Sequence, residues 1–261
     1  MQDKVLVIFA FCLSVILSSC EEKNTAEQQS ILLPPIQINE VLISYDNCHQ
    51  DSSTCTYVFL EYPEFSDSTK SDLNEVISGK LRVTASNYFR EEAIDGTFEH
   101  IAQSFIKDYQ SFKIDFPEYQ IGWYVKVFAE ITYESEGIFS FRIDSESFTG
   151  GAHPNSSTSF YVIDKQTKKE LSTSAIISDT SKFKNLLEAE FRRIKGMRGD
   201  QSFADRGFYI DEGDFLLNNN IGISDTKIMV HFNPYEIAPY AEGATTIEMN
   251  KSELKDILKI E

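Results

Sequence analysis

The chain has 261 residues, 41% of them hydrophobic and 13% aromatic, which is ample material for a buried core. Its 24 lysines and arginines face 41 aspartates and glutamates, giving a formal net charge of −17 at pH 7. A polyanion of this size repels nucleic acids and anionic lipids and attracts cationic partners at long range, although acidity also serves solubility alone.

Residues 1–19 have the pattern of a bacterial lipoprotein signal peptide. Lys4 precedes an apolar run over residues 5–17, which is too short to span a bilayer but has the length of a signal-peptide core. The tetrad LSSC at 17–20 resembles a lipobox, in which Cys20 carries the lipid anchor. An ordinary secretory signal cleaved nearby is the alternative. We therefore expect a cell-envelope protein, anchored by lipid on the periplasmic or surface face of the outer membrane.

The segment after the signal predicts a tether followed by two strands. Residues 20–35 are polar and charged and end in two prolines, which is typical of a flexible linker. Residues 36–46 and 54–65 are rich in Ile, Val, Tyr and Phe and predict neighbouring β-strands. Between them, Cys48 and Cys55 flank a turn-rich stretch. This favours a disulfide over a metal site, because no further ligand follows at a zinc spacing.

The middle of the chain predicts two helices and then a β-hairpin. Apolar residues at helical spacing indicate a helix over 67–89, with Asp72 as its expected cap. An aromatic stripe indicates a second helix over 97–117, with Thr97 available as its N-cap. The apolar period then changes to two over 123–134, and a turn leads into another strand over 138–148.

The second half predicts a strand over 158–164, a charged mobile surface loop over 196–207, and a last strand over 245–250 followed by a short helix opened by Asn250. A helix over 180–196 should turn five apolar side chains inward: Phe183, Leu186, Leu187, Phe191 and Ile194. The whole predicts an α+β fold with helices packed on antiparallel sheets, in two similar-sized subdomains at 36–143 and 144–261.

Motifs of known catalytic and cofactor sites are missing from the sequence. The four histidines have no partner at a helical metal-binding spacing, and neither nucleotide-binding loops nor hydrolase nucleophile motifs occur. Carboxylates are abundant, so a glycosidase-type pair stays open, but nothing selects one. We expect a protein that is not an enzyme and that has no cofactor, no metal and no nucleic-acid partner.

Two distant segments resemble one family of extracytoplasmic domains. They contain the sequences GGAHP at 150–154 and NPYEIAPYAEG at 233–243. Both are similar to the C-terminal domain shared by lysozyme-sensing anti-sigma factors of the RsiV type and by peptidoglycan deacetylases of the PdaC type. Residues 36–143 resemble, more loosely, the domain that precedes it in those proteins.

The resemblance implies a non-catalytic module, with lysozyme binding in one branch of the family. We expect neither anti-sigma nor deacetylase activity, because no sigma-binding segment or deacetylase domain is recognised in the sequence. The expected function is a lipid-anchored binding module for a cationic lysozyme-type muramidase. A module that binds peptidoglycan or another glycan is the alternative, and a carboxylate-dependent hydrolase is a more distant one.

Candidate ligand-binding residues lie within the two motifs, namely His153, Tyr235, Glu236 and Tyr240. A structural role is the alternative for each of them, because prolines and tyrosines pack irregular segments well and a histidine can be buried and hydrogen-bonded. The two glycines of GGAHP are expected first to serve strand geometry, through positive φ or close backbone approach.

Overall fold

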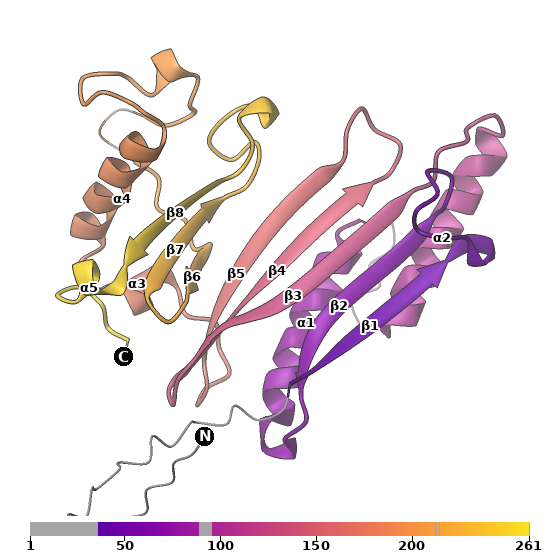
Figure 1. Ribbon diagram of the computed structural model, residues 1–261, viewed down its shortest axis with the longest axis horizontal. Coiled ribbons are helices and arrows are strands. Elements are labelled where there is room, and N and C mark those ends of the chain that lie inside the picture. The colour runs from indigo at the N-terminus through magenta and orange to yellow at the C-terminus, as the bar shows by residue number, and fades with distance from the viewer. Residues whose placement is uncertain (1–35, 89–95, 212, 214, 261) are drawn as a thin grey trace, which may run out of the picture. The chain divides into compact units, whose positions relative to one another are not determined.

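The computed structural model describes residues 36–88, 96–211, 213 and 215–260 (Figure 1). It confirms the α+β class, with a five-stranded and a three-stranded sheet and helices packed on both. The expected signal peptide, the tether and the lipid site at Cys20 lie outside the described residues. Within the described ranges, no helix is both long and apolar enough to cross a membrane.

The larger sheet has the strand order β1-β2-β3-β4-β5 and is mixed rather than purely antiparallel as expected. Its strands are β1 (Ile36–Ser44), β2 (Tyr57–Phe65), β3 (Tyr124–Glu134), β4 (Ile138–Phe148) and β5 (Asn155–Asp164). β2 and β3 are parallel, because the chain between them passes through two helices, α1 (Ser71–Ser86) and α2 (Phe98–Asp115), and so returns to the same end of the sheet. The other three pairs are antiparallel.

Both halves of the sequence contribute strands to this sheet. The expected border between residues 143 and 144 falls inside β4, and β5 pairs with β4 along its whole length. Phe139 and Ile163 belong to the core beneath α1 and α2, whereas Ile138 and Val162 belong to the core of the smaller sheet. The two cores therefore lie on opposite faces of shared strands, since successive side chains of a strand point to opposite faces.

Helix α2 forms as its sequence predicts. The side chain of Thr97 caps it by accepting a hydrogen bond from the backbone N–H of His100 at 3.3 Å. The buried stripe on the sheet-facing side includes Ile101, Phe105 and Tyr109. The 3.6-residue apolar period thus places the helix against the larger sheet.

Helix α1 begins differently from the prediction. Asp72 lies within the first helical turn and does not cap the helix. Asp67 instead caps a preceding 3₁₀ turn, η2 (Ser68–Lys70), by accepting a hydrogen bond from the N–H of Thr69 at 2.9 Å. The helix continues directly from this turn. The side-chain cap therefore lies about one turn before the expected position at Asp72.

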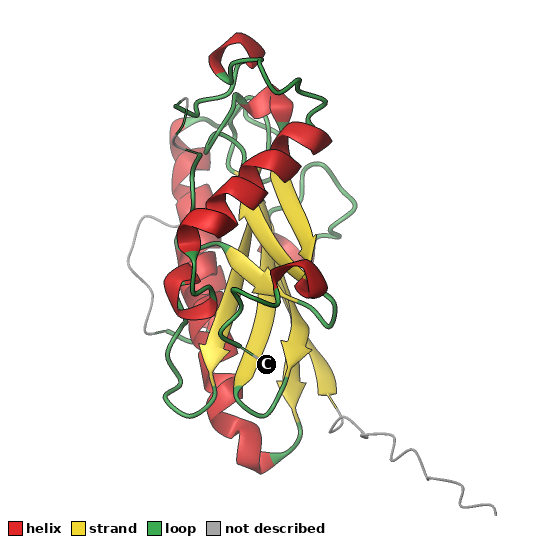
Figure 2. Cartoon of the chain, turned by 90° about the vertical axis from the view of Figure 1, so that its left-hand side faces the viewer, coloured by secondary structure: helices red, strands yellow, loops and turns green. Residues whose placement is uncertain are grey.

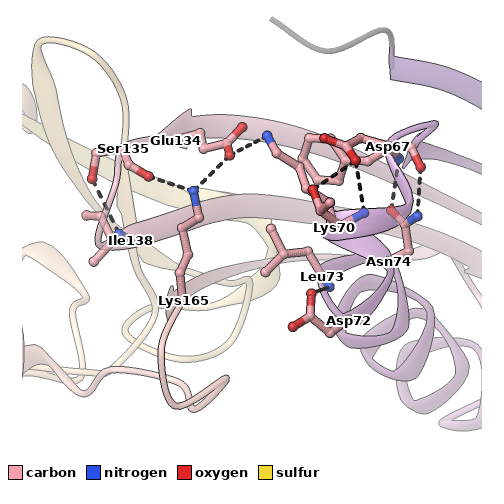
Figure 3. A network of polar contacts seen from close by, with 11 residues as sticks. Asp67, Lys70, Asp72, Leu73, Asn74, Glu134, Ser135, Ile138 and Lys165 are labelled. Atoms are coloured by element: carbon pink, nitrogen blue, oxygen red, sulfur yellow. Dashed lines mark hydrogen bonds and ion pairs between the residues drawn. The ribbon is translucent and has the colours of Figure 1, made fainter.

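A largely buried carboxylate ties the start of α1 to the end of β3 (Figure 3). Glu134 Oε1 lies 2.6 Å from the Nζ atom of Lys70 and 2.9 Å from that of Lys165. Burial alone would raise the pKa of Glu134, but the hydrogen bonds from the two lysines hold it below its usual value. This paired charge joins segments from both halves of the sequence.

The smaller sheet is antiparallel, with the order β6-β7-β8. Its strands are β6 (Ile221–Ile223), β7 (Lys227–Phe232) and β8 (Thr245–Asn250), and α4 (Thr180–Ile194) packs across them (Figure 2). The shorter described elements are α3 (Thr173–Ile176), α5 (Lys251–Leu254), η1 (Tyr45–Asn47), η3 (Ala204–Arg206) and η4 (Tyr240–Glu242).

Two expectations for this region are corrected. Phe183, Leu187 and Phe191 of α4 are buried, but Leu186 and Ile194 are 36% and 40% exposed and line a groove beside β8. A single helical face is too narrow to bury all five residues. The segment 196–207 is not simply a surface loop, because Phe203 is fully buried against Phe191 and its neighbours.

Asparagine side chains from the smaller sheet close the outer edge of β5. Asn220 Oδ1 accepts a hydrogen bond from the N–H of Phe160 at 2.8 Å, and Asn220 Nδ2 donates to the carbonyl of Thr158 at 2.8 Å. Asn233 Oδ1 accepts from the N–H of Thr158 at 2.7 Å. The carbonyl of Val162 accepts from the backbone N–H of Leu171. The N–H groups of Thr158 and Phe160 and the carbonyls of Thr158 and Val162 are therefore paired on the outer side of β5 without a further strand.

Candidate functional site

The predicted disulfide between Cys48 and Cys55 is confirmed, with a Cα–Cα distance of 5.5 Å. It closes the loop between β1 and β2. Open space of about 320 Å³ lies beside this loop and is also lined by Tyr57 and Tyr124 of the larger sheet. The disulfide therefore fixes one wall of a shallow groove on the face of the larger sheet that α1 and α2 do not cover.

The two family motifs meet in space although about eighty residues separate them. The ring of His153 stacks on that of Tyr240, with centroids 3.8 Å apart and planes 19° apart. Tyr240 Oη donates a hydrogen bond to the carbonyl of Pro154 at 2.9 Å. The ring of Tyr235 lies 5.5 Å from that of Tyr240, and its Oη atom is 3.4 Å from His153 Nε2. We call His153, Tyr235 and Tyr240 the aromatic cluster.

Tyr235 is the most unusual member of the aromatic cluster. Its side chain is 57% exposed, and its backbone φ of 71° lies in the left-handed region, which side chains other than glycine adopt at a cost of about 1–2 kcal/mol. The surrounding fold must hold this conformation. Strained backbone of this kind concentrates at functional sites.

The other candidate residues differ in their surroundings. His153 is half-exposed rather than buried, with Nδ1 2.8 Å from the carbonyl of Pro154. Glu236 is exposed and makes no ring contact, but its Oε1 accepts a hydrogen bond from Asn233 Nδ2 at 3.3 Å. Glu236 is thus attached to the asparagine that closes β5, at the margin of the aromatic cluster.

An acid–tyrosine pair near the aromatic cluster escaped the sequence analysis. Tyr124 Oη donates to Glu146 Oε1 at 2.5 Å, and Lys126 Nζ lies 4.7 Å from the centroid of the Tyr124 ring. Burial, and then the hydrogen bond to Glu146, raise the pKa of Tyr124 well above its usual value, with smaller contributions from Tyr57 and Tyr240. The period-two pattern along β3 predicts that Tyr124 and Lys126 point to the same face of the strand. It does not show that the helices leave this face uncovered.

The glycine requirement of GGAHP falls on one of its two glycines. Gly150 has φ +91°, and a Cβ atom there would lie 3.1 Å from Tyr119 Oη and 3.2 Å from Trp123 Nε1. Gly151 has ordinary backbone, and the nearest atom to an added Cβ would be 3.8 Å away. The expectation for the pair therefore holds at Gly150 and not at Gly151.

His231, in β7, is buried and was not singled out from the sequence. Its Nδ1 atom lies 2.8 Å from Thr246 Oγ1, and burial lowers its pKa. In the ranges that the structure describes, no group of three His, Cys, Asp or Glu side chains is arranged to hold a metal ion. The site offers stacking faces, hydroxyl groups and carboxylates, which suit non-covalent recognition.

Two families match the chain in succession. Residues 49–156 match the family described as Deacetylase PdaC, and residues 160–252 match one described as a protein of unknown function, DUF3298. The first range contains the GGAHP motif, and the second contains NPYEIAPYAEG. The aromatic cluster is therefore built from both matched regions. A search of curated proteins finds no match.

Solved structures of DUF3298 proteins share the fold. One is a DUF3298 family protein from Pseudomonas aeruginosa PAO1, solved at 2.15 Å resolution, and another is a DUF3298 family member from Bacteroides fragilis NCTC 9343, solved at 2.30 Å. Each is 16% identical, with a TM-score of 0.60, and the alignment covers 87% of this chain and 95% of the other. At this identity the likeness shows the fold alone. The matches support an accessory module of the cell envelope and confirm the resemblance, since a match to the PdaC family is followed along the chain by a match to DUF3298.

Proposed function

We propose that the protein is a non-catalytic, lipid-anchored binding module of the cell envelope whose aromatic cluster binds a cationic lysozyme-type muramidase. The exposure and backbone conformation of Tyr235 are the observations that carry the proposal. An exposed tyrosine in a costly backbone conformation, packed at a tilt against a second tyrosine whose ring stacks on a histidine, is a rigid contact surface formed before the partner arrives. Pre-organised aromatic side chains of this kind dominate many protein interfaces.

Charge supports a basic partner. The chain has a net charge of −17, and Glu236 and Glu242 are exposed beside the aromatic cluster. Carboxylates around an aromatic centre attract a cationic protein and orient it during approach, and this attraction weakens as salt screens it. Lipid attachment at Cys20 would hold the module at the membrane, and the lipobox pattern is its support.

A glycan ligand is the second candidate, favoured by the groove beside the disulfide loop. The stacked rings of Tyr57 and Tyr124, with centroids 5.8 Å apart, line this groove together with polar residues of the loop. Aromatic faces flanked by hydroxyl and amide groups suit sugar rings. Binding of an uncharged glycan would depend little on salt, which separates the two candidates.

The test is a calorimetric titration of the full chain carrying Cys20→Ala with a basic lysozyme. We expect recovery of this variant from the soluble fraction, and a dissociation constant that rises at least about tenfold from about 20 mM to about 150 mM salt. Absence of heat at low salt would reject the muramidase. Salt-independent binding of peptidoglycan fragments would favour the glycan instead.

Tyr235→Gly separates binding from folding. Glycine adopts the left-handed backbone freely, so the free energy of unfolding should stay the same or rise by up to about 1 kcal/mol, while lysozyme binding weakens at least about tenfold. Lys168→Gly is the matched control, because Lys168 also has positive φ, at 59°, and lies in the turn after β5. It should leave binding unchanged. Equal binding by Tyr235→Gly and the unmodified chain would remove the aromatic cluster from the site.

A further inference from the structure

No residue that the structure describes pairs with the outer edge of β1. The N–H of Tyr45 donates to the carbonyl of Thr56 at 2.8 Å, which continues the β1–β2 ladder. Backbone groups alternate in direction along an antiparallel strand. The even-numbered residues within Ile36–Ser44 therefore turn their N–H and C=O groups away from β2. None of these groups bonds to another residue that the structure describes.

The side chains beside this edge are apolar and exposed. Ile36, Ile38 and Leu42 are 37%, 60% and 48% exposed, and they lie on the face of the sheet that α1 and α2 leave open. A groove of about 500 Å³ continues from Ile36 and Ile38 past Pro63 to Phe128. Edge strands of soluble proteins normally carry lysine, proline or a bulge that blocks pairing. β1 has none of these, and its one charged residue is Glu40.

We propose that a second copy of this chain pairs with β1 in antiparallel fashion about a two-fold axis, joining two five-stranded sheets into one. An isologous contact requires a patch that is complementary to itself. With Asn39 on the axis, Ile36 lies opposite Leu42 of the second copy, and Ile38 lies opposite Glu40. Every pair formed by even-numbered residues then joins outward backbone groups. In this register the two Glu40 residues lie diagonally across the axis rather than directly opposite each other.

The charge of the chain gives self-pairing a characteristic salt dependence. Two copies that each carry −17 repel at low salt, and added salt screens this repulsion. Self-association through β1 should therefore strengthen as salt rises, whereas binding of a cationic partner should weaken. The two salt dependences have opposite signs, so self-association can be tested independently of the proposed function.

The test is sedimentation equilibrium of the full chain carrying Cys20→Ala across a range of concentration and salt. We expect a monomer–dimer equilibrium that shifts toward dimer with salt. On this background, Ile38→Glu should raise the dissociation constant of the dimer at least about tenfold. Ile194→Glu is the matched control, because Ile194 is 40% exposed on α4 and should leave the equilibrium unchanged.

A second variant tests the backbone directly. Leu42→Pro removes an outward N–H group and should abolish the dimer while the bonds to β2 and the melting temperature persist. A monomer at all concentrations in high salt would overturn the proposal, as would a dimer that survives both Ile38→Glu and Leu42→Pro. Dimerisation that appears only after deletion of residues 21–33 would also overturn it, and would make that segment the occupant of the edge.

Discussion

The two outer edges of the five-stranded sheet end in opposite ways. At β5, Asn220 and Asn233 bond both backbone groups of Thr158 and the N–H of Phe160, so this part of the edge is closed by side chains. At β1, the outward backbone groups meet no described partner, and apolar side chains stand exposed beside them. The DUF3298 region thus completes one side of a sheet that begins in the PdaC region. An edge strand can be closed without another strand, and the edge that is left open is the one available for association.

The largest expected effect comes from opening the β5 edge. Asn220→Ala leaves the buried N–H of Phe160 without its acceptor and should lower the free energy of unfolding by about 2 kcal/mol, because an unpaired buried donor costs about 1–3 kcal/mol. Urea denaturation measures the change. Glu40→Ala on the β1 edge is the control and should change it by less than about 0.5 kcal/mol.

A graded variant sharpens this test. Asn220→Asp keeps an oxygen that can accept from Phe160 but cannot donate to the carbonyl of Thr158, so its stability should fall between those of the unmodified chain and Asn220→Ala. If Asn220→Ala were as stable as the unmodified chain, the asparagine would not be what closes β5.

An effect of similar size is expected from crowding the contact between β6 and β5. A Cβ atom on Gly222 would lie 2.2 Å from Cδ1 of Phe160, whose ring is buried. Gly222→Ala should therefore lower the free energy of unfolding by about 1–3 kcal/mol, through displacement of a packed ring. Gly137→Ala, in the β3–β4 turn with no atom within 4 Å of the added Cβ, should leave the free energy of unfolding nearly unchanged in the same urea denaturation. Similar losses in both variants would mean that close packing at Phe160 is not the cause.

Local sequence patterns predicted the elements whose causes are local. The apolar stripe of α2, its cap at Thr97 and the disulfide between Cys48 and Cys55 depend on neighbouring residues, and all three are confirmed. The closure of β5 was not predicted. Asn220 and Asn233 look like ordinary turn residues in sequence, and their partners are set by tertiary packing with strand residues 60 and 75 positions earlier in the chain.

The candidate site was likewise predicted only where its features depend on local sequence. The resemblance identified the two motifs, and the structure brings His153, Tyr235 and Tyr240 together. It did not reveal which backbone positions are constrained. The positive φ of Tyr235 belongs to a residue type that gives no signal for it. Likewise, the exposed face that carries Tyr124 depends on where the helices pack, and alternation along one strand cannot show this.

Amide hydrogen exchange, resolved by residue, tests the contrast between the two edges most directly. In dilute solution at low salt, the N–H groups of Thr158 and Phe160 should be strongly protected, while those of Ile38, Glu40 and Leu42 exchange rapidly. Raising protein concentration and salt should protect the β1 amides and leave those of β5 unchanged. Slow exchange at β1 that does not depend on concentration, or rapid exchange at Thr158 and Phe160, would contradict the account.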